Sequence, residues 1–347
     1  MNPVSSRLLG QQLICPQFRD PADVVSWMGA IQGQDYRAMR WAVAMRTRKP
    51  SFKAFHLAYD SGKIIRTHLL RTTWQLVSGE DLPWMISLCG KKAMAGLRGW
   101  MNSQGVSISQ QEQEKVQDIL VQLLSGGKSV FREDISEELS LRGTPIDDTL
   151  LGYHLRIAEI KGLICSGHLH ASRNTYSLVA EKIPSPLSLS REEALSLLAR
   201  KYFRSRGVAT LEDFLWWSGL NVMDCRRGID SLGKEIQRWT SHGREYLFME
   251  ESRSRGFRKG NVLLVPAFDE YLISYKSRDV VLDPDYAFHA HDKKGIFRHI
   301  VSLDGQIVGN WSPNAPGCNV KVFKEGVILP EESLSREIQR FNYAKTH

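Results

Sequence analysis

Hydrophobic residues recur at helical spacing in three successive blocks of this chain, and each block ends in a β-rich segment. In the first block the apolar positions within residues 24–31 share one helix face, after the helix-start signal Asp20-Pro21. Two more helical runs follow, and residues 64–77 then predict a hairpin, because they are rich in β-branched and aromatic side chains. Three helices followed by a hairpin is the element order of a winged helix.

The second block repeats this order. Its first helix ends at Gly126-Gly127, a second helix follows Arg132, and a third begins at Thr144-Pro145. Residues 163–179 then predict a hairpin whose basic tip contains Arg173. Of the three blocks, this one has the most complete winged-helix pattern.

Three capped helices open the third block, and residues 246–249 with 262–265 are predicted to form its wing. The helix caps are Ser190, Thr210 and Asn221. From Pro266 onward the chain changes to β segments, and a final helix begins at Pro330.

These patterns predict an α+β protein with three tandem winged-helix modules and a C-terminal β-rich part, either a small sheet or a barrel. The predicted divisions are residues 1–109 for the first module, which holds the Gln-x-Gln element, 110–186 for the second, 187–265 for the third and 266–347 for the C-terminal part with its final helix.

Composition narrows the class of protein. With 347 residues, 42% of them hydrophobic and 24% charged, the chain is ordinary for a globular protein of two or three modules. No apolar run approaches the ~20 residues of a membrane span, and no signal-peptide pattern is present. The 5 cysteines are scattered without a Cys-x-x-Cys pair, which argues against disulfides and a zinc site and favours a reducing cytoplasm.

Basic charge is concentrated in the first and third modules. The net charges of the four divisions are +8, −3, +4 and −1, and the whole chain carries +8. Two basic modules could flank a polyanion if the fold brings them to one face. The alternative is that the lysines and arginines only solvate helices.

Gln32-Gly33-Gln34 lies between the first two helical runs, and Gly33 is suited to a break in the helix. Two amides on either side of a turn could point into one pocket. The alternative is a polar corner between helices in which both amides are solvated.

Four stretches, residues 31–34, 66–77, 264–279 and 304–311, together resemble the winged-helix proteins of the AlkZ/YcaQ type, which are bacterial alkylpurine DNA glycosylases. They are similar, in order, to the family's Gln-x-Gln element, its first wing hairpin and two parts of its C-terminal region. The resemblance implies a concave body, double-stranded DNA as the partner and a DNA repair activity without a cofactor. Gly33 departs from the aliphatic residue that the AlkZ group generally has at this position.

Under this resemblance Gln32 and Gln34 are the catalytic residues of a monofunctional glycosylase. N7-alkylguanine and N3-alkyladenine, alone or in crosslinks, already carry a positive charge before the glycosidic bond breaks, so their departure needs no strong general acid. We expect Gln34 to hold the attacking water and Gln32 to orient this water or the sugar. Asp35 could add a carboxylate near the developing cation, or it could instead cap the following helix.

The predicted DNA contacts are basic or wing residues, and two aromatic residues are candidates for base stacking, although burial in a core is the commoner role of such rings. The predicted contacts are Arg66, His68, Arg71, Arg173, Arg255, Arg258 and Lys259, and the stacking candidates are Tyr36 and Trp74.

No metal is expected, because the His-x-His pairs at 168–170 and 289–291 lack further ligands at recognised spacing. We expect a monomer without membrane contact. A second class of function stays open, namely a DNA-binding regulator or damage binder that uses the same fold without catalysis.

Overall fold

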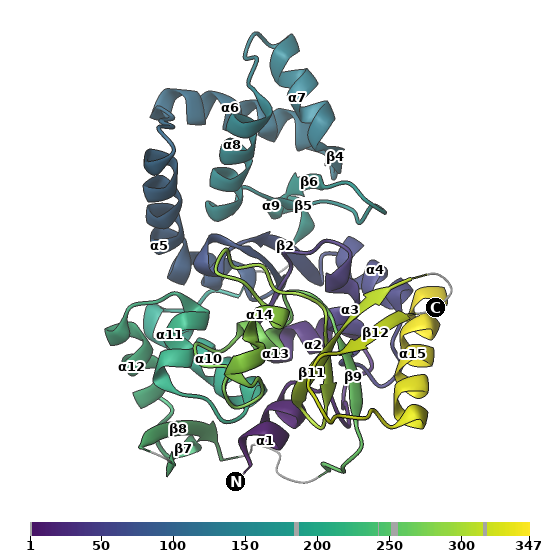
Figure 1. The fold of residues 1–347 in the computed structure, drawn as a ribbon. Coiled ribbons are helices and arrows are strands. Elements are labelled where there is room, and N and C mark those ends of the chain that lie inside the picture. Colours follow the sequence, from purple (N-terminus) through teal and green to yellow (C-terminus); the bar gives the residue numbers. More distant parts are fainter. Residues whose placement is uncertain (1, 184–186, 242, 251–255, 315–317) are drawn as a thin grey trace. The chain divides into compact units, whose positions relative to one another are not determined.

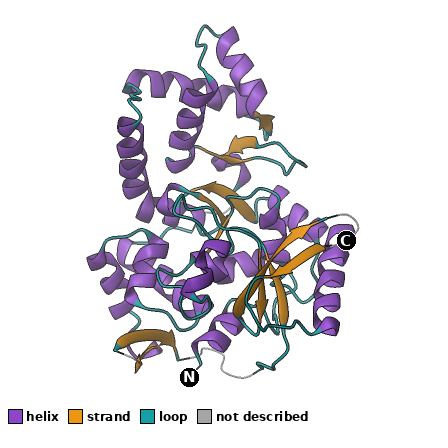
Figure 2. Cartoon of the chain, viewed as in Figure 1, coloured by secondary structure: helices purple, strands orange, loops and turns teal. Residues whose placement is uncertain are grey.

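The computed structural model describes residues 2–183, 187–241, 243–250, 256–314 and 318–347 (Figure 1). The chain divides into two compact units, one formed by Met1–Phe55 together with Leu195–His347 and the other by His56–Ala194. Helices and small antiparallel sheets are present in both (Figure 2), which confirms the predicted α+β class. The division into modules at residues 109, 186 and 265 stays a prediction.

The unit that contains both ends of the chain is built from most of the helices and strands. In order they are α1 (Pro3–Gly10), α2 (Pro21–Met28), β1 (Ala30–Gln32), α3 (Ala38–Ala44), α10 (Arg191–Arg206), α11 (Leu211–Ser218), α12 (Val222–Asp230), η2 (Gly233–Glu235), β7 (Ile236–Ser241), β8 (Arg244–Met249), β9 (Val262–Val265), α13 (Glu270–Ile273), η3 (Pro284–Tyr286), α14 (Ala287–Ala290), β10 (Ile300–Leu303), β11 (Gln306–Pro313), β12 (Cys318–Val322) and α15 (Glu331–Thr346).

The other unit holds the first predicted wing and the whole second block. Its elements are α4 (Phe52–Asp60, which begins before the boundary), β2 (Ile64–His68), η1 (Leu70–Thr72), β3 (Trp74–Ser78), α5 (Leu82–Ser103), α6 (Gln110–Leu124), β4 (Val130–Phe131), α7 (Arg132–Leu141), α8 (Asp148–Ile160), β5 (Ile164–Ser166), β6 (Thr175–Leu178) and α9 (Val179–Lys182).

The core of the first unit surrounds its C-terminal sheet, which has the strand order β12-β11-β10-β9. Side chains of α1, α3, α13 and α15 pack against these strands. The indole N–H groups of two core residues are satisfied by strand carbonyls, because Trp41 donates to Leu264 O at 2.6 Å and Trp311 donates to Val265 O at 2.8 Å. Over the described part of the chain the sheet does not close into a barrel, so the C-terminal part contains a small open sheet.

The helices of the second block form as the sequence predicts. A capping box starts α6, because the Ser109 hydroxyl accepts the N–H of Glu112 while the Glu112 carboxylate accepts the N–H of Ser109. The apolar faces of α6, α7 and α8 meet in one core with the sheet of order β4-β6-β5. The third helix begins three residues later than predicted, because Asp147 accepts the N–H of Leu150 at 2.9 Å and caps it there.

The helical pattern up to Ile31 overestimates the length of α2. The helix ends at Met28 and is capped by Gly29, whose φ of +75° is unfavourable for residues with a side chain, and residues 30–32 continue as the strand β1. The spacing of Ile31 therefore coincides with helical periodicity, although this residue lies in an extended segment.

The predicted wing of the third block is wrong. β8 pairs with β7, with Trp239 opposite Tyr246, and their rings stack at 5.4 Å. β9 instead pairs with β10, with Val265 opposite Ile300. All four residues of β9 are buried, as suits a strand inside a core, whereas β7 alternates with exposed positions as a surface hairpin does.

Candidate functional site

The two glutamines of the Gln-x-Gln element lie in different surroundings. Gln32 ends β1 and is 4% exposed, whereas Gln34 follows in an exposed, irregular segment. A buried, fixed first residue and an accessible second residue therefore make up this element.

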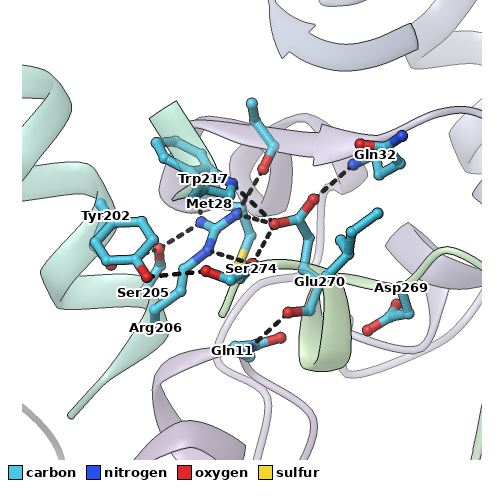
Figure 3. A network of polar contacts seen from close by, with 12 residues as sticks. Gln11, Met28, Gln32, Tyr202, Ser205, Arg206, Trp217, Asp269, Glu270 and Ser274 are labelled. Atoms are coloured by element: carbon cyan, nitrogen blue, oxygen red, sulfur yellow. Dashed lines mark hydrogen bonds and ion pairs between the residues drawn. The ribbon is translucent and has the colours of Figure 1, made fainter. Parts of the chain in front are cut away.

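Glu270 holds the main chain of Gln32 from inside the core (Figure 3). Its Oε1 accepts the backbone N–H of Gln32 at 2.7 Å. Its Oε2 accepts hydrogen bonds from Nη2 of Arg206 at 2.5 Å, from Nε1 of Trp217 at 3.0 Å and from the hydroxyl of Ser274. The carboxylate is 0% exposed, and these hydrogen bonds replace the water that it loses on burial.

Arg206, which ends α10, holds the start of the same strand. Its Nη2 also donates to Ala30 O at 2.8 Å, and its Nη1 donates to Met28 O (Figure 3). Its Nε donates to the Ser274 hydroxyl at 3.1 Å. The Glu270–Arg206 ion pair therefore contacts the chain before, within and at the end of β1.

A second buried ion pair adjoins the first. Asp269 accepts hydrogen bonds from both terminal nitrogens of Arg46, each at 2.8 Å. Its Oδ1 also accepts a hydrogen bond from the N–H of Tyr271, so that Asp269 caps α13. Arg46 further donates to Gln11 Oε1 at 3.0 Å. Asp269 and Glu270 therefore anchor α13 to two different parts of the unit.

Asp35 caps α3 with one carboxylate oxygen. Its Oδ1 accepts the N–H groups of Arg37 at 2.9 Å and Ala38 at 2.8 Å. Tyr36 is half-buried, with the Arg40 guanidinium 5.3 Å from its ring centre. The capping alternative for Asp35 is thus realised, while its proposed electrostatic support and base stacking by Tyr36 stay predictions.

His299 is near the site and was missed by sequence reasoning. Its Nδ1 accepts the N–H of Ala267 at 3.1 Å, which leaves the proton of the neutral ring on Nε2. Burial lowers the pKa of His299, and the negative charge of Asp35 acts in the opposite direction. A single histidine before a strand gives no sequence signal for this placement.

Two predicted contact residues and one stacking candidate on β2 and β3 pack against one another in the other unit. Arg66 is 2% exposed, and its guanidinium lies 3.7 Å from the Trp74 ring centre while donating to Asn174 Oδ1 at 3.2 Å. The His68 ring is 4.0 Å from Trp74. Contact of these side chains with DNA stays a prediction, but the structure gives each of them a partner within the protein.

His68 is also paired with a carboxyl group. Its Nδ1 lies 2.5 Å from Oε2 of Glu159. Burial lowers the pKa of His68 well below its usual value and raises the pKa of Glu159 well above its own. Both directions favour neutral groups that share one proton, so His68 does not present a free positive charge at neutral pH.

The remaining predicted contacts are more accessible. Arg71 is half-buried in the turn between β2 and β3 with a φ of 54°, and Arg173 is exposed with its guanidinium 3.8 Å from the Phe131 ring centre. Arg258 and Lys259 are exposed ahead of β9. Arg255 lies outside the described residues.

Neither a metal centre nor a membrane span is found in the portions of the chain that the structure describes. No group of three or more His, Cys, Asp or Glu side chains there could hold a metal ion. None of the helices in those same portions combines the length and the apolar character needed to cross a bilayer.

Two comparisons with known proteins match nearly the whole chain. Residues 25–340 match the model of a family described as DNA glycosylase AlkZ-like. The solved structure of Streptomyces sahachiroi DNA glycosylase AlkZ is similar with a TM-score of 0.80 and 20% sequence identity, over 99% of this chain and 96% of that chain. A search of curated proteins finds no match.

Proposed function

The chain belongs to the AlkZ-like DNA glycosylase family, and from this premise we propose that it hydrolyses the N-glycosidic bond of cationic alkylpurines in double-stranded DNA. Its substrates on this proposal are N7-alkylguanine and N3-alkyladenine. The catalytic residues are Gln32 and Gln34, and the enzyme does not cleave the strand, because no nucleophilic lysine belongs to this element.

The observation that carries this proposal is the contrast between the two glutamines. Gln32 has a fixed main chain, through the 2.7 Å hydrogen bond to Glu270, while Gln34 is accessible to solvent and DNA. An alkylated purine already carries positive charge, so departure of the base does not require a strong acid. The amide oxygens position water and stabilise the oxocarbenium-like sugar.

Phosphate contacts supply most of the affinity for DNA on this proposal. The accessible residues Arg71, Arg173, Arg258 and Lys259 make these contacts. The buried side chains of Arg66 and His68 act through the shape of the wing between β2 and β3, because their polar atoms already have protein partners.

The test is base release from a duplex with one N7-alkylguanine, under single-turnover conditions. We expect Gln34→Ala and Gln32→Ala each to slow release by roughly 10²-fold, the scale of a positioned catalytic group, while affinity for the duplex changes little. Uracil and undamaged purines should not be released, because these bases carry no positive charge and are poorer leaving groups.

Wild-type protein that binds the lesion but releases no base would place the chain in the non-enzymatic class. Equal rates for the wild type and both variants would instead move the active site away from this element.

A further inference from the structure

We propose that Glu270 is a positioning residue for catalysis. It fixes the position of the Gln32–Gln34 element through its hydrogen bond to the main chain of Gln32. The inference rests on the proposed function, because it explains how two amides are kept in a geometry that can react. Glu270 itself touches no substrate in this account. It acts from beneath the site, together with Arg206 (Figure 3).

Glycines, which restrict the backbone least, stand at both ends of the strand β1. Gly29 precedes it with a φ of +75°, and Gly33 follows it without a side chain to pack. The strand has only three residues, Ala30–Gln32. Ala30 O accepts a hydrogen bond from Arg206, and the Gln32 N–H donates one to Glu270, so both ends of the strand are held.

The network is fully buried, which makes its geometry stiff. Glu270, Arg206, Ser274 and Trp217 are each 0% exposed. Charged hydrogen bonds are stronger where water is excluded, and a buried charge that loses a partner is costly. The position of Gln32 is therefore coupled to the ion pair, and a shift of about 1 Å in a positioning element can cost roughly 10²-fold in rate.

The chain supplies a matched control one residue away. Asp269 forms an equally buried ion pair with Arg46, at 2.8 Å, in the same two-residue segment. Its hydrogen bonds go to Arg46 and to the N–H of Tyr271 rather than to β1. Asp269→Asn therefore disturbs a buried ion pair of the unit without removing a contact to Gln32.

The experiment compares Glu270→Gln and Glu270→Asp with Asp269→Asn in the full-length protein. Glu270→Gln keeps an acceptor for Gln32 but loses the charge, whereas Glu270→Asp keeps the charge but shortens the reach. Hydrogen exchange of the backbone N–H groups of residues 30–34 is measured first. Single-turnover base release and duplex affinity are measured next.

We expect both Glu270 variants to exchange the Gln32 N–H at least tenfold faster and to release the base roughly 10- to 100-fold more slowly, with duplex affinity within about twofold of wild type. Asp269→Asn should lose thermal stability but retain the wild-type exchange rate at Gln32 and most of the rate of base release. If Glu270→Gln folds poorly, Ser274→Ala removes only one hydroxyl donor and should give the same pattern at smaller amplitude.

Unchanged exchange at Gln32 in both Glu270 variants, or equal slowing by Asp269→Asn, would overturn the proposal. Failure of the proposed function has a different signature. In that case the wild type releases no base, or Gln34→Ala keeps the wild-type rate, while the exchange measurement still reports whether Glu270 holds Gln32.

Discussion

Burial separates the basic side chains into two groups with different roles. Arg66, Arg46 and Arg206 are at most 2% exposed and pair with aromatic rings, carboxylates or carbonyls of the protein. Arg173 and Arg258 are exposed. Only the second kind can neutralise a phosphate without leaving a protein group unpaired.

This division predicts opposite phenotypes for two arginines of the same unit. Arg173→Glu should weaken binding to any duplex, damaged or not, and leave the melting temperature nearly unchanged. Arg66→Ala should cost about 1–3 kcal/mol of stability, because it removes a buried stack and a hydrogen bond. Fluorescence anisotropy with unmodified duplex and thermal melting measure the two effects. If the Arg66→Ala protein is as stable as wild type but has lost affinity for DNA, Arg66 contacts DNA directly.

Residue by residue, the catalytic candidates were visible in the sequence but their support was not. Gln32 and Gln34 stand out as a pair around Gly33. Glu270 lies 238 positions from Gln32, and its partner Arg206 is one of many arginines in a basic chain. No local pattern marks which of these charges is buried, because burial is decided by tertiary packing.

At the scale of elements, α15 carries a buried carboxyl group, Glu337, among the apolar side chains that it packs against the core. Glu337 is 5% exposed, and burial raises its pKa, with Arg340 acting in the opposite direction. An acid whose pKa is raised by folding contributes most stability when protonated, at low pH. This contribution is lost as the pH rises through the folded-state pKa.

Glu337→Gln should therefore gain stability relative to wild type as the pH rises from 4 to 8, because the amide stays neutral throughout. Melting temperatures across this range test the expectation. Glu331→Gln, on the exposed first turn of the same helix, is the control and should follow the wild-type curve. If the difference in melting temperature between wild type and Glu337→Gln does not change with pH, the positive charge of Arg340 fully offsets the cost of burying the carboxylate.

Elements with local signals were predictable, and those defined by distant partners were not. The start of α2 at Asp20-Pro21 and the capping boxes of α6 and α11 follow directly from short-range chemistry. The strand after Gly29 and the partner of β9 do not. Both depend on residues far along the chain, namely Arg206 and Glu270 for Ala30–Gln32, and β10 for Val262–Val265.

For the whole molecule, uneven charge is the main prediction about binding. Divisions with net charges of +8 and +4 should give an affinity for undamaged duplex that falls steeply with salt. The slope of log affinity against log salt should be about −0.9 for each phosphate neutralised. Arg173→Glu should make this slope shallower by about 0.9, the contribution of one phosphate contact. Titrations at several salt concentrations measure this, and salt-insensitive binding would remove phosphate contacts from the account.

The unit that holds the glutamines is assembled from the two ends of the chain, with His56–Ala194 inserted between them. During synthesis, residues 1–55 leave the ribosome long before Glu270 exists. At typical translation rates the interval between Gln32 and Glu270 is roughly 10–50 s. For that time Gln32 lacks its partner Glu270, and Trp41 and Arg46 lack their partners Leu264 and Asp269. A chain that ends before Glu270 would therefore carry both glutamines without the carboxylate that accepts the backbone N–H of Gln32.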